Sequence, residues 1–519
     1  MSQIKLELHD IQGDVLIGLQ KDYELFYFFE IKDISAFKSA LRGQIASRIT
    51  SCLLAQAREQ HLNEIKKRGG AKQRLPLHGL NTGFTATGLK KLIGASAEGL
   101  EQAFVDGAAK RAKDLNDPVG KDCKPLNWDG LKRETIGTGI SENANFDGDR
   151  VDGVFLFTGP DVESVVACRD EIYRILAGSI TEVYQEIGHV RAPQRGHEHF
   201  GFLDGVSQPG IRGVDTASDP VGNPKQGLPG QDLLWPGEFV FGYTKQPTTP
   251  ETDISKPGKC AEPPHEWMHN GSYMVFRRLK QLVPEFNAFV DDTAENLGLD
   301  RELLGARLVG RWKSGTPIII SPLQDDPALG ADETRNNHFE YGGDAGARRC
   351  PFGAHIRKAY PRDDLNEAGG SGEIGVQQHR IKRAGIPFGP EVKDVEENET
   401  KFDRGLMFVC YQTSIEKQFE FVQKQWVNNA NFPNSDDPDN AGAKPREYPN
   451  GDLATPGHDP LIGQSASTNR ARTFEELVPN HPTGDKRTSC SIPKDFVIPT
   501  AAGYFFMPSI SALVSTLSS

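Results

Sequence analysis

The stretch Val151-Asp-Gly-Val-Phe-Leu-Phe157 is dense in apolar, β-branched and aromatic residues, which predicts a buried strand. Asp161 then stands where a side chain can cap a helix, and apolar residues follow at helical spacing. Those apolar residues are Val165, Val166, Cys168, Ile172 and Ile175. The segment Thr181 to Ile187 has the pattern of a second strand. This order predicts a sheet that helices cover on at least one face.

The same alternation of strands and helices occurs on both sides of this stretch. Toward the N-terminus we expect a strand over Leu25–Ile31 and a helix beginning over Ser35–Leu41. The second half of the chain repeats this order. Strands are expected there over Ser272–Leu279 and Gly405–Tyr411, with helices opened by Pro284 and over Ile415–Trp426.

Two copies of one α+β design are therefore expected, with a boundary near residue 190. The predicted domains are residues 1–190 and 191–519 of the 519-residue chain. Long connections rich in Gly, Pro and Asp separate the elements, at about 212–265, 323–350, 361–380 and 428–495. Long ordered loops in a compact protein usually build or cover a site.

The composition excludes several classes of protein. Hydrophobic residues make up 37% of the chain and charged residues 25%, and no apolar run approaches the length of a membrane span. A net charge of −12 disfavours nucleic acid and anionic membrane surfaces as partners. The seven cysteines are scattered, without a C-x-x-C pair, so neither a structural zinc site nor a disulfide framework is expected.

One glycine-flanked turn, Gly201-Phe-Leu-Asp204-Gly205, can present a single carboxylate among apolar neighbours. A lone acid in such a place suits proton transfer in a dry pocket. The alternative is a turn in which Asp204 only hydrogen-bonds to its own backbone. By itself the turn favours this second interpretation.

Three further segments carry candidate groups. His355 stands among small and apolar residues, where an imidazole can bind iron, copper or zinc. Arg383 precedes a Gly/Pro-controlled bend that could point its permanent charge into a cavity. Asp459 lies in a tight turn and could fix a ligand histidine. The alternatives are a structural histidine, a solvated basic face and a turn aspartate.

Together these segments resemble the dye-decolourising peroxidase family, fungal type, through nearly the whole chain. The motifs that carry the resemblance stand in family order. They are Asp10-Ile-Gln-Gly-Asp-Val-Leu16, Glu198-His-Phe-Gly-Phe-Leu-Asp-Gly205, Leu304-Gly-Ala-Arg-Leu-Val-Gly-Arg-Trp312, the block Cys350–Arg362, the Arg383 bend, Gly405–Tyr411 and Tyr504-Phe-Phe-Met-Pro-Ser509.

The resemblance implies two ferredoxin-like units of the dimeric α+β barrel type, with antiparallel sheets covered by helices and long loops around a haem pocket. It implies one haem b per chain, with His355 as proximal iron ligand and Asp459 accepting the other N–H of that imidazole. Asp204 and Arg383 match the distal acid/base and its cationic partner.

Other matched positions concern the pocket walls and the route of electrons. Leu406 and Phe408 match the apolar pair that shapes the distal pocket. Trp426 matches a surface tryptophan used by some members for long-range electron transfer. Phe388 stands where a relative can carry a radical-supporting tyrosine, which puts a tyrosyl role at that position in doubt.

Haem propionates need cationic partners, because unpaired buried carboxylates are costly. Arg357 and Arg311 are the candidates. Arg357 would share a face with His355 if that segment were extended.

The expected function is therefore reduction of hydrogen peroxide, by way of a ferryl intermediate, with oxidation of bulky anthraquinone dyes, phenols and other one-electron donors. One alternative is a non-catalytic haem-binding or haem-delivery protein, and another is a metal-free hydrolase built on Asp204 and His199. The protein is expected to act as a monomer or homodimer. The resemblance favours secretion, whereas the N-terminal sequence shows no leader and leaves a cytoplasmic location open. Manganese oxidation and the physiological donor stay open.

Overall fold

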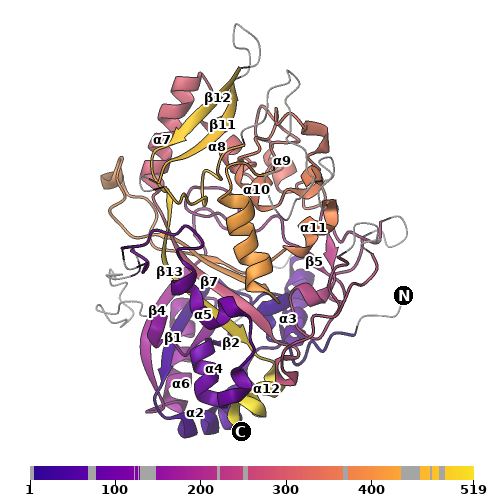
Figure 1. Cartoon of the computed structure of the whole chain (residues 1–519), viewed down its shortest axis with the longest axis vertical. Coiled ribbons are helices and arrows are strands. Elements are labelled where there is room, and N and C mark those ends of the chain that lie inside the picture. The colour runs from indigo at the N-terminus through magenta and orange to yellow at the C-terminus, as the bar shows by residue number, and fades with distance from the viewer. Residues whose placement is uncertain are drawn as a thin grey trace.

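A computed structural model describes most of the chain (Figure 1). The described residues are 5–67, 77–121, 123–126, 128, 148–218, 223–248, 255–365, 372–433, 456–467, 470–478 and 486–519. Elements from the first 190 residues occupy the lower part of the view in Figure 1, and most helices of the second half lie above them. No helix in the described part of the chain is long and apolar enough to cross a membrane.

A nine-stranded sheet is the centre of the molecule, in the order β4-β1-β3-β2-β13-β7-β10-β8, with β9 paired to β10. Its strands are β1 (Tyr23–Ile31), β2 (Gly79–Phe84), β3 (Gly153–Gly159), β4 (Ile180–His189), β7 (Ser272–Gln281), β8 (Lys382–Arg383), β9 (Ile386–Phe388), β10 (Gly405–Gln412) and β13 (Val497–Met507). Their pairings are antiparallel. β13, from the end of the chain, lies between the two halves and pairs with β2 through Phe506 and Phe84.

The predicted strands and helices are present. The segment that opened the sequence analysis forms β3, α6 (Val162–Ile175) and β4, and Asp161 caps α6 by accepting the backbone N–H of Ser164. Pro284 stands in the first turn of α7 (Val283–Leu297), where a missing N–H is harmless. The helix expected over Ile415–Trp426 contains two π-helical pieces, η10 (Ile415–Phe419) and η11 (Val422–Val427).

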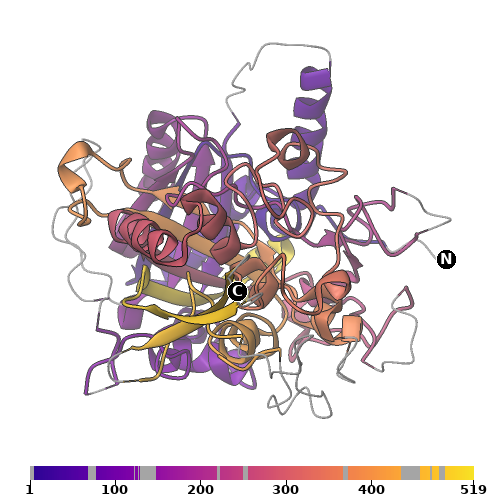
Figure 2. The ribbon, with the colours of Figure 1, turned by 90° about the horizontal axis from the view of Figure 1, so that it is seen from above.

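Helices cover one face of the N-terminal half of the sheet, and on the other face Phe26 and Phe28 pack against Phe276 of β7. The remaining α-helices are α1 (Gly13–Leu16), α2 (Ile34–Ala40), α3 (Cys52–Lys67), α4 (Ala86–Ile93), α5 (Gln102–Arg111), α8 (Arg301–Val309), α9 (Pro327–Gly330), α10 (His355–Ala359), α11 (Gly372–Gln378) and α12 (Ile510–Val514). α3 extends outward from the body of the molecule in the view from above (Figure 2).

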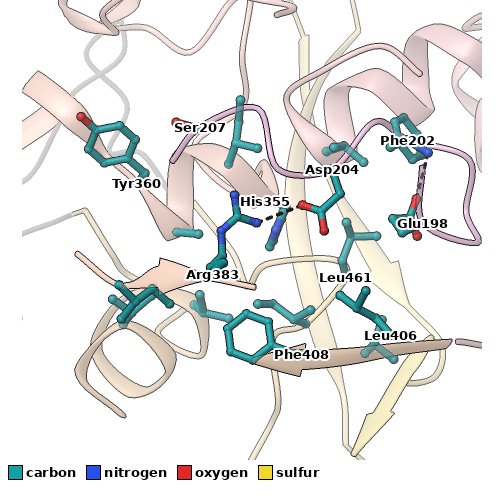
Figure 3. A pocket seen from close by; sticks show the side chains of 18 of the residues that line it. Glu198, Phe202, Asp204, Ser207, His355, Tyr360, Arg383, Leu406, Phe408 and Leu461 are labelled. Carbon is teal, nitrogen blue, oxygen red and sulfur yellow. Dashed lines mark hydrogen bonds and ion pairs between the residues drawn. The ribbon is translucent and has the colours of Figure 1, made fainter. Parts of the chain in front are cut away.

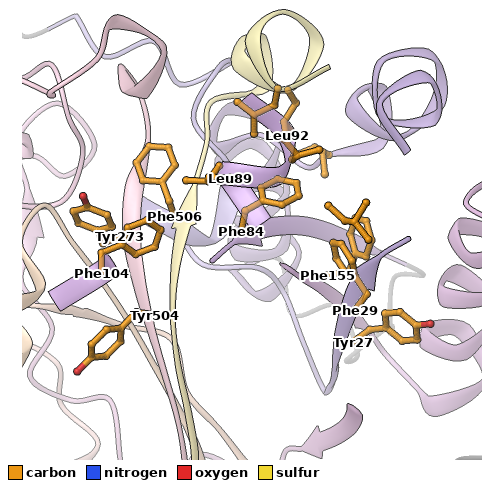
Figure 4. Packing of buried hydrophobic residues seen from close by; sticks show 14 of the residues in the cluster. Tyr27, Phe29, Phe84, Leu89, Leu92, Phe104, Phe155, Tyr273, Tyr504 and Phe506 are labelled. Atoms are coloured by element: carbon orange, nitrogen blue, oxygen red, sulfur yellow. The ribbon is translucent and has the colours of Figure 1, made fainter. Parts of the chain in front are cut away.

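The main core lies between one face of this sheet and the helices α2, α4, α5, α6 and α12 (Figure 4). Phe29 stacks on Phe155 at a centroid distance of 4.8 Å, across the paired strands β1 and β3. Phe84 meets Phe29 edge to face. These aromatic contacts stabilise the strands that the densest apolar stretches of the sequence form.

The predicted loops contain regular elements that were not expected. The loop 323–350 contains α9, the loop 361–380 contains α11, and part of the loop 428–495 is a hairpin. Its strands are β11 (Arg472–Val478) and β12 (Lys486–Ile492). Both strands are rich in polar residues, so they lack the apolar density that identified the other strands. Residues 434–455 of the same stretch lie outside the described residues. Within the predicted loop 212–265, β6 (Leu233–Leu234) pairs in parallel with β5 (Gly210–Ile211), which lies just before the loop.

Candidate active site

A cavity of about 250 Å³ lies between the C-terminal half of the sheet and the loops above it (Figure 3). The segment 198–207 forms one wall, α10 another and β10 a third. His355, Asp204 and Arg383 all line it, although they stand far apart in the sequence. The cavity thus gathers the candidate groups of three separate segments.

His355 is the first residue of α10. Its Nδ1 atom forms a hydrogen bond with Oδ2 of Asp459, at 2.7 Å. Asp459 is fully buried and also accepts the backbone N–H groups of Leu461 and Ile462 at 2.8 and 3.0 Å. Burial disfavours a charged imidazole, but the carboxylate outweighs it and raises the pKa of His355. With Nδ1 held by Asp459, Nε2 is the ring nitrogen left to act as a ligand.

Asp204 and Arg383 form an ion pair in the cavity, with 3.0 Å between Oδ1 and Nη1 (Figure 3). The turn around Asp204 needs glycine, because Gly201 and Gly205 have φ values of +93° and +81°. Arg383 lies on β8, opposite Cys410 of β10. Gln208 holds its backbone, since the Gln208 amide donates to the Arg383 carbonyl at 2.9 Å and accepts the Arg383 N–H at 3.2 Å.

Glu198 organises the same turn and was not among the residues predicted for the site. Its carboxylate is partly buried and accepts the backbone N–H groups of Phe200 and Phe202, each at 2.8 Å. Figure 3 shows the bond from Phe202. The side-chain amide of Gln281 donates to it at 2.5 Å. Burial raises the pKa of Glu198. Its place six residues before Asp204 was the available signal, but only the fold shows what the carboxylate binds.

Leu406 and Phe408 alternate on β10 and both line the cavity (Figure 3). Met407 and Val409, on the other face of the strand, are buried in a separate core cluster. The alternation of a strand therefore places the two predicted apolar residues on one wall.

The two arginines predicted to meet haem propionates differ. Arg311 lines the cavity and is buried, and its guanidinium donates to the carbonyls of Gly315 and Asn336 and to the side-chain oxygen of Asn337. Burial, with the nearby charge of Arg362, lowers the pKa of Arg311 to about 9. Among the described residues the hydrogen-bond partners of Arg311 are all neutral, so an anion entering the cavity would meet a charge that no carboxylate pairs.

The expectation for Arg357 was wrong. Arg357 is not in the cavity wall, and its guanidinium is bound to Asp364, at 2.6 and 2.7 Å, and to Asp344. The sequence analysis placed it beside His355 by assuming an extended segment, whereas both residues lie on the helix α10. Residues two apart on a helix point to different sides, which turns Arg357 away from the cavity.

The expectation of a surface tryptophan at position 426 was also wrong. Only 1% of Trp426 is exposed. Its ring stacks on Phe432 at 5.4 Å between centroids and meets Phe421 edge to face at 5.5 Å. The π-helical η11 turns the indole inward, into a small cluster with Leu365 and Val376. A donor in solution cannot touch it.

His199 does not join Asp204 in the cavity. Its Nε2 lies 2.8 Å from the carbonyl oxygen of Phe388, and the residue is buried elsewhere. Burial and the charge of Arg191 lower the pKa of His199 to about 4. The arrangement that a hydrolase would need is therefore missing from the described part of the structure.

Comparison with known families agrees with this arrangement. The family model described as the DyP dimeric alpha+beta barrel domain matches residues 10–192. The model described as Dyp-type peroxidase, C-terminal, matches residues 241–436. The two models together span most of the chain, one in each half.

Characterised relatives are similar over the whole length. The dye-decolorizing peroxidase msp1 of Mycetinis scorodonius is 38% identical, with 100% of this chain and 89% of the relative covered. The dye-decolorizing peroxidase AauDyP1 of Auricularia auricula-judae is 36% identical, over 99% and 87%. An ancestral D-type dye-decolorizing peroxidase is structurally similar, with a TM-score of 0.79 and 39% identity over 99% of this chain and 100% of that one. The chain therefore belongs to the dye-decolourising peroxidase family.

Proposed function

We propose that this protein is a haem peroxidase that reduces hydrogen peroxide while oxidising bulky dyes of the anthraquinone type, phenols and other one-electron donors. The observation that carries the proposal is that the pairs His355–Asp459 and Asp204–Arg383 line one cavity. Relatives support the donor class, since a dye-decolorizing peroxidase of known structure was solved with 2,6-dimethoxyphenol. We therefore assign the protein, among the oxidoreductases, to the peroxidases that decolourise dyes.

The residues of the cavity fit one haem b per chain. Nε2 of His355 has no hydrogen-bond partner among the described residues and is available to iron. Arg311 offers a propionate a buried cation that only neutral groups now bind. Leu406, Phe408 and Leu461 supply apolar wall for the macrocycle (Figure 3).

Bound haem would supply the iron at which the peroxide O–O bond is cleaved. Asp204 would take the proton of the inner peroxide oxygen and return it to the outer one, which leaves as water. Arg383 would stabilise the charge that develops on the departing oxygen, and it also holds Asp204 in place. Asp459, by accepting the Nδ1 proton, would fix the ring of His355 and increase its basicity.

The alternative function, haem binding or delivery without catalysis, is not favoured. Such a protein would need His355 but has no use for an ion-paired Asp204 and Arg383 in the same cavity. The relatives that match over the whole chain are peroxidases.

Replacing Arg383 tests the proposal directly. The Arg383→Leu variant should bind haem as the parent does, because His355 is untouched. Its reaction with peroxide, followed by stopped-flow absorbance of the haem band, should be slower by about 10² to 10³-fold, as for loss of one charge-stabilising donor. The exposed Arg48 provides a matched control, and Arg48→Leu should react as the parent does. A parent that binds haem but shows no spectral change with peroxide would refute the function.

A further inference from the structure

A tyrosine, Tyr360, lies at the far end of the cavity. Tyr360 is the residue that ends α10, five positions after His355, and its ring lines the cavity. Figure 3 shows it at the opposite end of the pocket from Leu406, with its hydroxyl directed away from His355 and Arg383. The Tyr360 side chain therefore extends from the cavity wall in the direction away from His355 and Arg383.

The hydroxyl group of Tyr360 donates a short hydrogen bond to the carboxylate of Asp232. Asp232 stands just before β6, and 12% of its side chain is exposed, so it has access to solvent. Asp232 also pairs with Arg380, at 3.3 Å. A carboxylate already bonded to the phenol is well placed to receive its proton.

Two guanidinium groups lie over the Tyr360 ring. The Cζ atom of Arg380 is 3.6 Å from the ring centroid, and that of Arg362 is 4.8 Å from it. Positive charges at this distance raise the free energy of a tyrosine radical cation, the species that would form if the ring lost an electron and kept its proton. Removal of an electron from Tyr360 therefore requires that its proton leave as well, and Asp232 is the acceptor in contact.

Two other oxidisable aromatic residues in or near the cavity, Tyr341 and Trp426, each lack one of these features. Tyr341 is the second tyrosine among the described cavity-lining residues, but it is fully buried and its hydroxyl has no hydrogen-bond partner. Its oxidation would leave a proton with no acceptor. Trp426 is not in the cavity wall, although Tyr360 packs against the cluster that contains it.

We propose that Tyr360 carries oxidising equivalents from the cavity toward the surface, with Asp232 as its proton acceptor. This inference rests on the proposed function, because the peroxide reaction supplies the oxidant. That oxidant takes one electron from the Tyr360 phenol as its O–H bond breaks and the proton passes to Asp232. The products are a neutral tyrosyl radical and a protonated Asp232.

The cycle closes with an electron from an aromatic donor. A phenol at the surface gives one electron to the tyrosyl radical, Asp232 returns the proton, and the donor releases its own proton to solvent. Each peroxide reduced to water requires two electrons and therefore two such transfers. Donors too large for the cavity would be oxidised by this route without approaching the haem.

The test is electron paramagnetic resonance on haem-loaded protein that is mixed with peroxide and frozen within milliseconds. Protein grown with ring-deuterated tyrosine identifies a tyrosyl signal by its narrowed lines. We expect the signal in the parent and in the matched control Tyr341→Phe, and its loss in Tyr360→Phe. A tyrosyl signal of parental intensity in Tyr360→Phe would overturn the assignment.

A second variant tests the proton acceptor. Asp232→Asn keeps a group that can accept the hydroxyl hydrogen bond but cannot take up the proton, so the radical should form at least about 100-fold more slowly. Formation at the parental rate would exclude Asp232 from the step. The haem spectrum separates the two proposals: a parent that reacts with peroxide without a Tyr360 radical refutes only this inference. A parent that does not react with peroxide refutes the proposed function and the inference with it.

Discussion

At the scale of single residues, buried His199 makes stability depend on pH. Its pKa is lowered from 6.5 to about 4, first by burial and then by the charge of Arg191. Between these values the unfolded chain binds a proton that the folded protein does not, so stability rises with pH across the window. Above pH 6.5 this histidine does not reduce the stability of the folded protein. As pH falls from 6.5 toward 4, the free energy of unfolding decreases. The total decrease in the free energy of unfolding is on the order of 3 kcal/mol.

We expect His199→Gln to flatten this dependence. The free energy of unfolding, measured by urea denaturation at about pH 7 and pH 4.5, should differ less between the two conditions than in the parent. His61, exposed on α3, gives the control His61→Gln, which should keep the parental difference. An unchanged pH dependence in His199→Gln would show that this imidazole is not the group that titrates.

At the scale of elements, the turn that presents Asp204 depends on Glu198. One oxygen of this carboxylate accepts the N–H of Phe200 and the other that of Phe202, which fixes the backbone two residues before Asp204. In Glu198→Ala both donors are left buried without a partner, at a cost of about 1 to 3 kcal/mol each. Asp204 should then lose its fixed position against Arg383.

The expected result is a less stable protein whose reaction with peroxide is slowed while haem binding is kept, measured by thermal unfolding and stopped-flow absorbance. Glu302 serves as control because its side chain is 44% exposed, and Glu302→Ala should leave both measurements near the parental values. Parental peroxide reactivity in Glu198→Ala would mean that the glycines alone hold the turn.

At the scale of the whole molecule, a buried ion pair joins the two halves. Arg277, on β7, donates through Nη2 to both oxygens of Asp117 at 2.6 and 2.7 Å, and 4% and 2% of the two side chains are exposed. Removing the carboxylate in Asp117→Ala strands a buried guanidinium, which should cost about 3 to 5 kcal/mol. Chemical denaturation measures this loss. The exposed pair Arg48–Glu171 is the comparison, since Glu171→Ala should cost no more than about 1 kcal/mol.

Much of the fold and of the site could be predicted from the sequence, because their signals are local. The aromatic density of β1, β3 and β10, the capping Asp161 and the first-turn Pro284 depend only on neighbouring residues. The positions of the cavity groups came from motifs that stand in family order. The polar hairpin β11–β12 was missed, because pairing between its strands, and not their composition, makes it a sheet.

The sequence by itself determined which residues are proposed to carry the chemistry: an imidazole, a carboxylate held in a glycine turn, and a guanidinium at a bend. The tertiary structure alone decided how those and other groups face one another. It turned Arg357 away from the cavity and left Arg311 in it, buried Trp426, and brought Tyr360 to Asp232, 128 positions away. The physical reason is that periodicity and turn chemistry are properties of neighbouring residues. Burial and pairing between distant residues follow only from the packing of the whole chain.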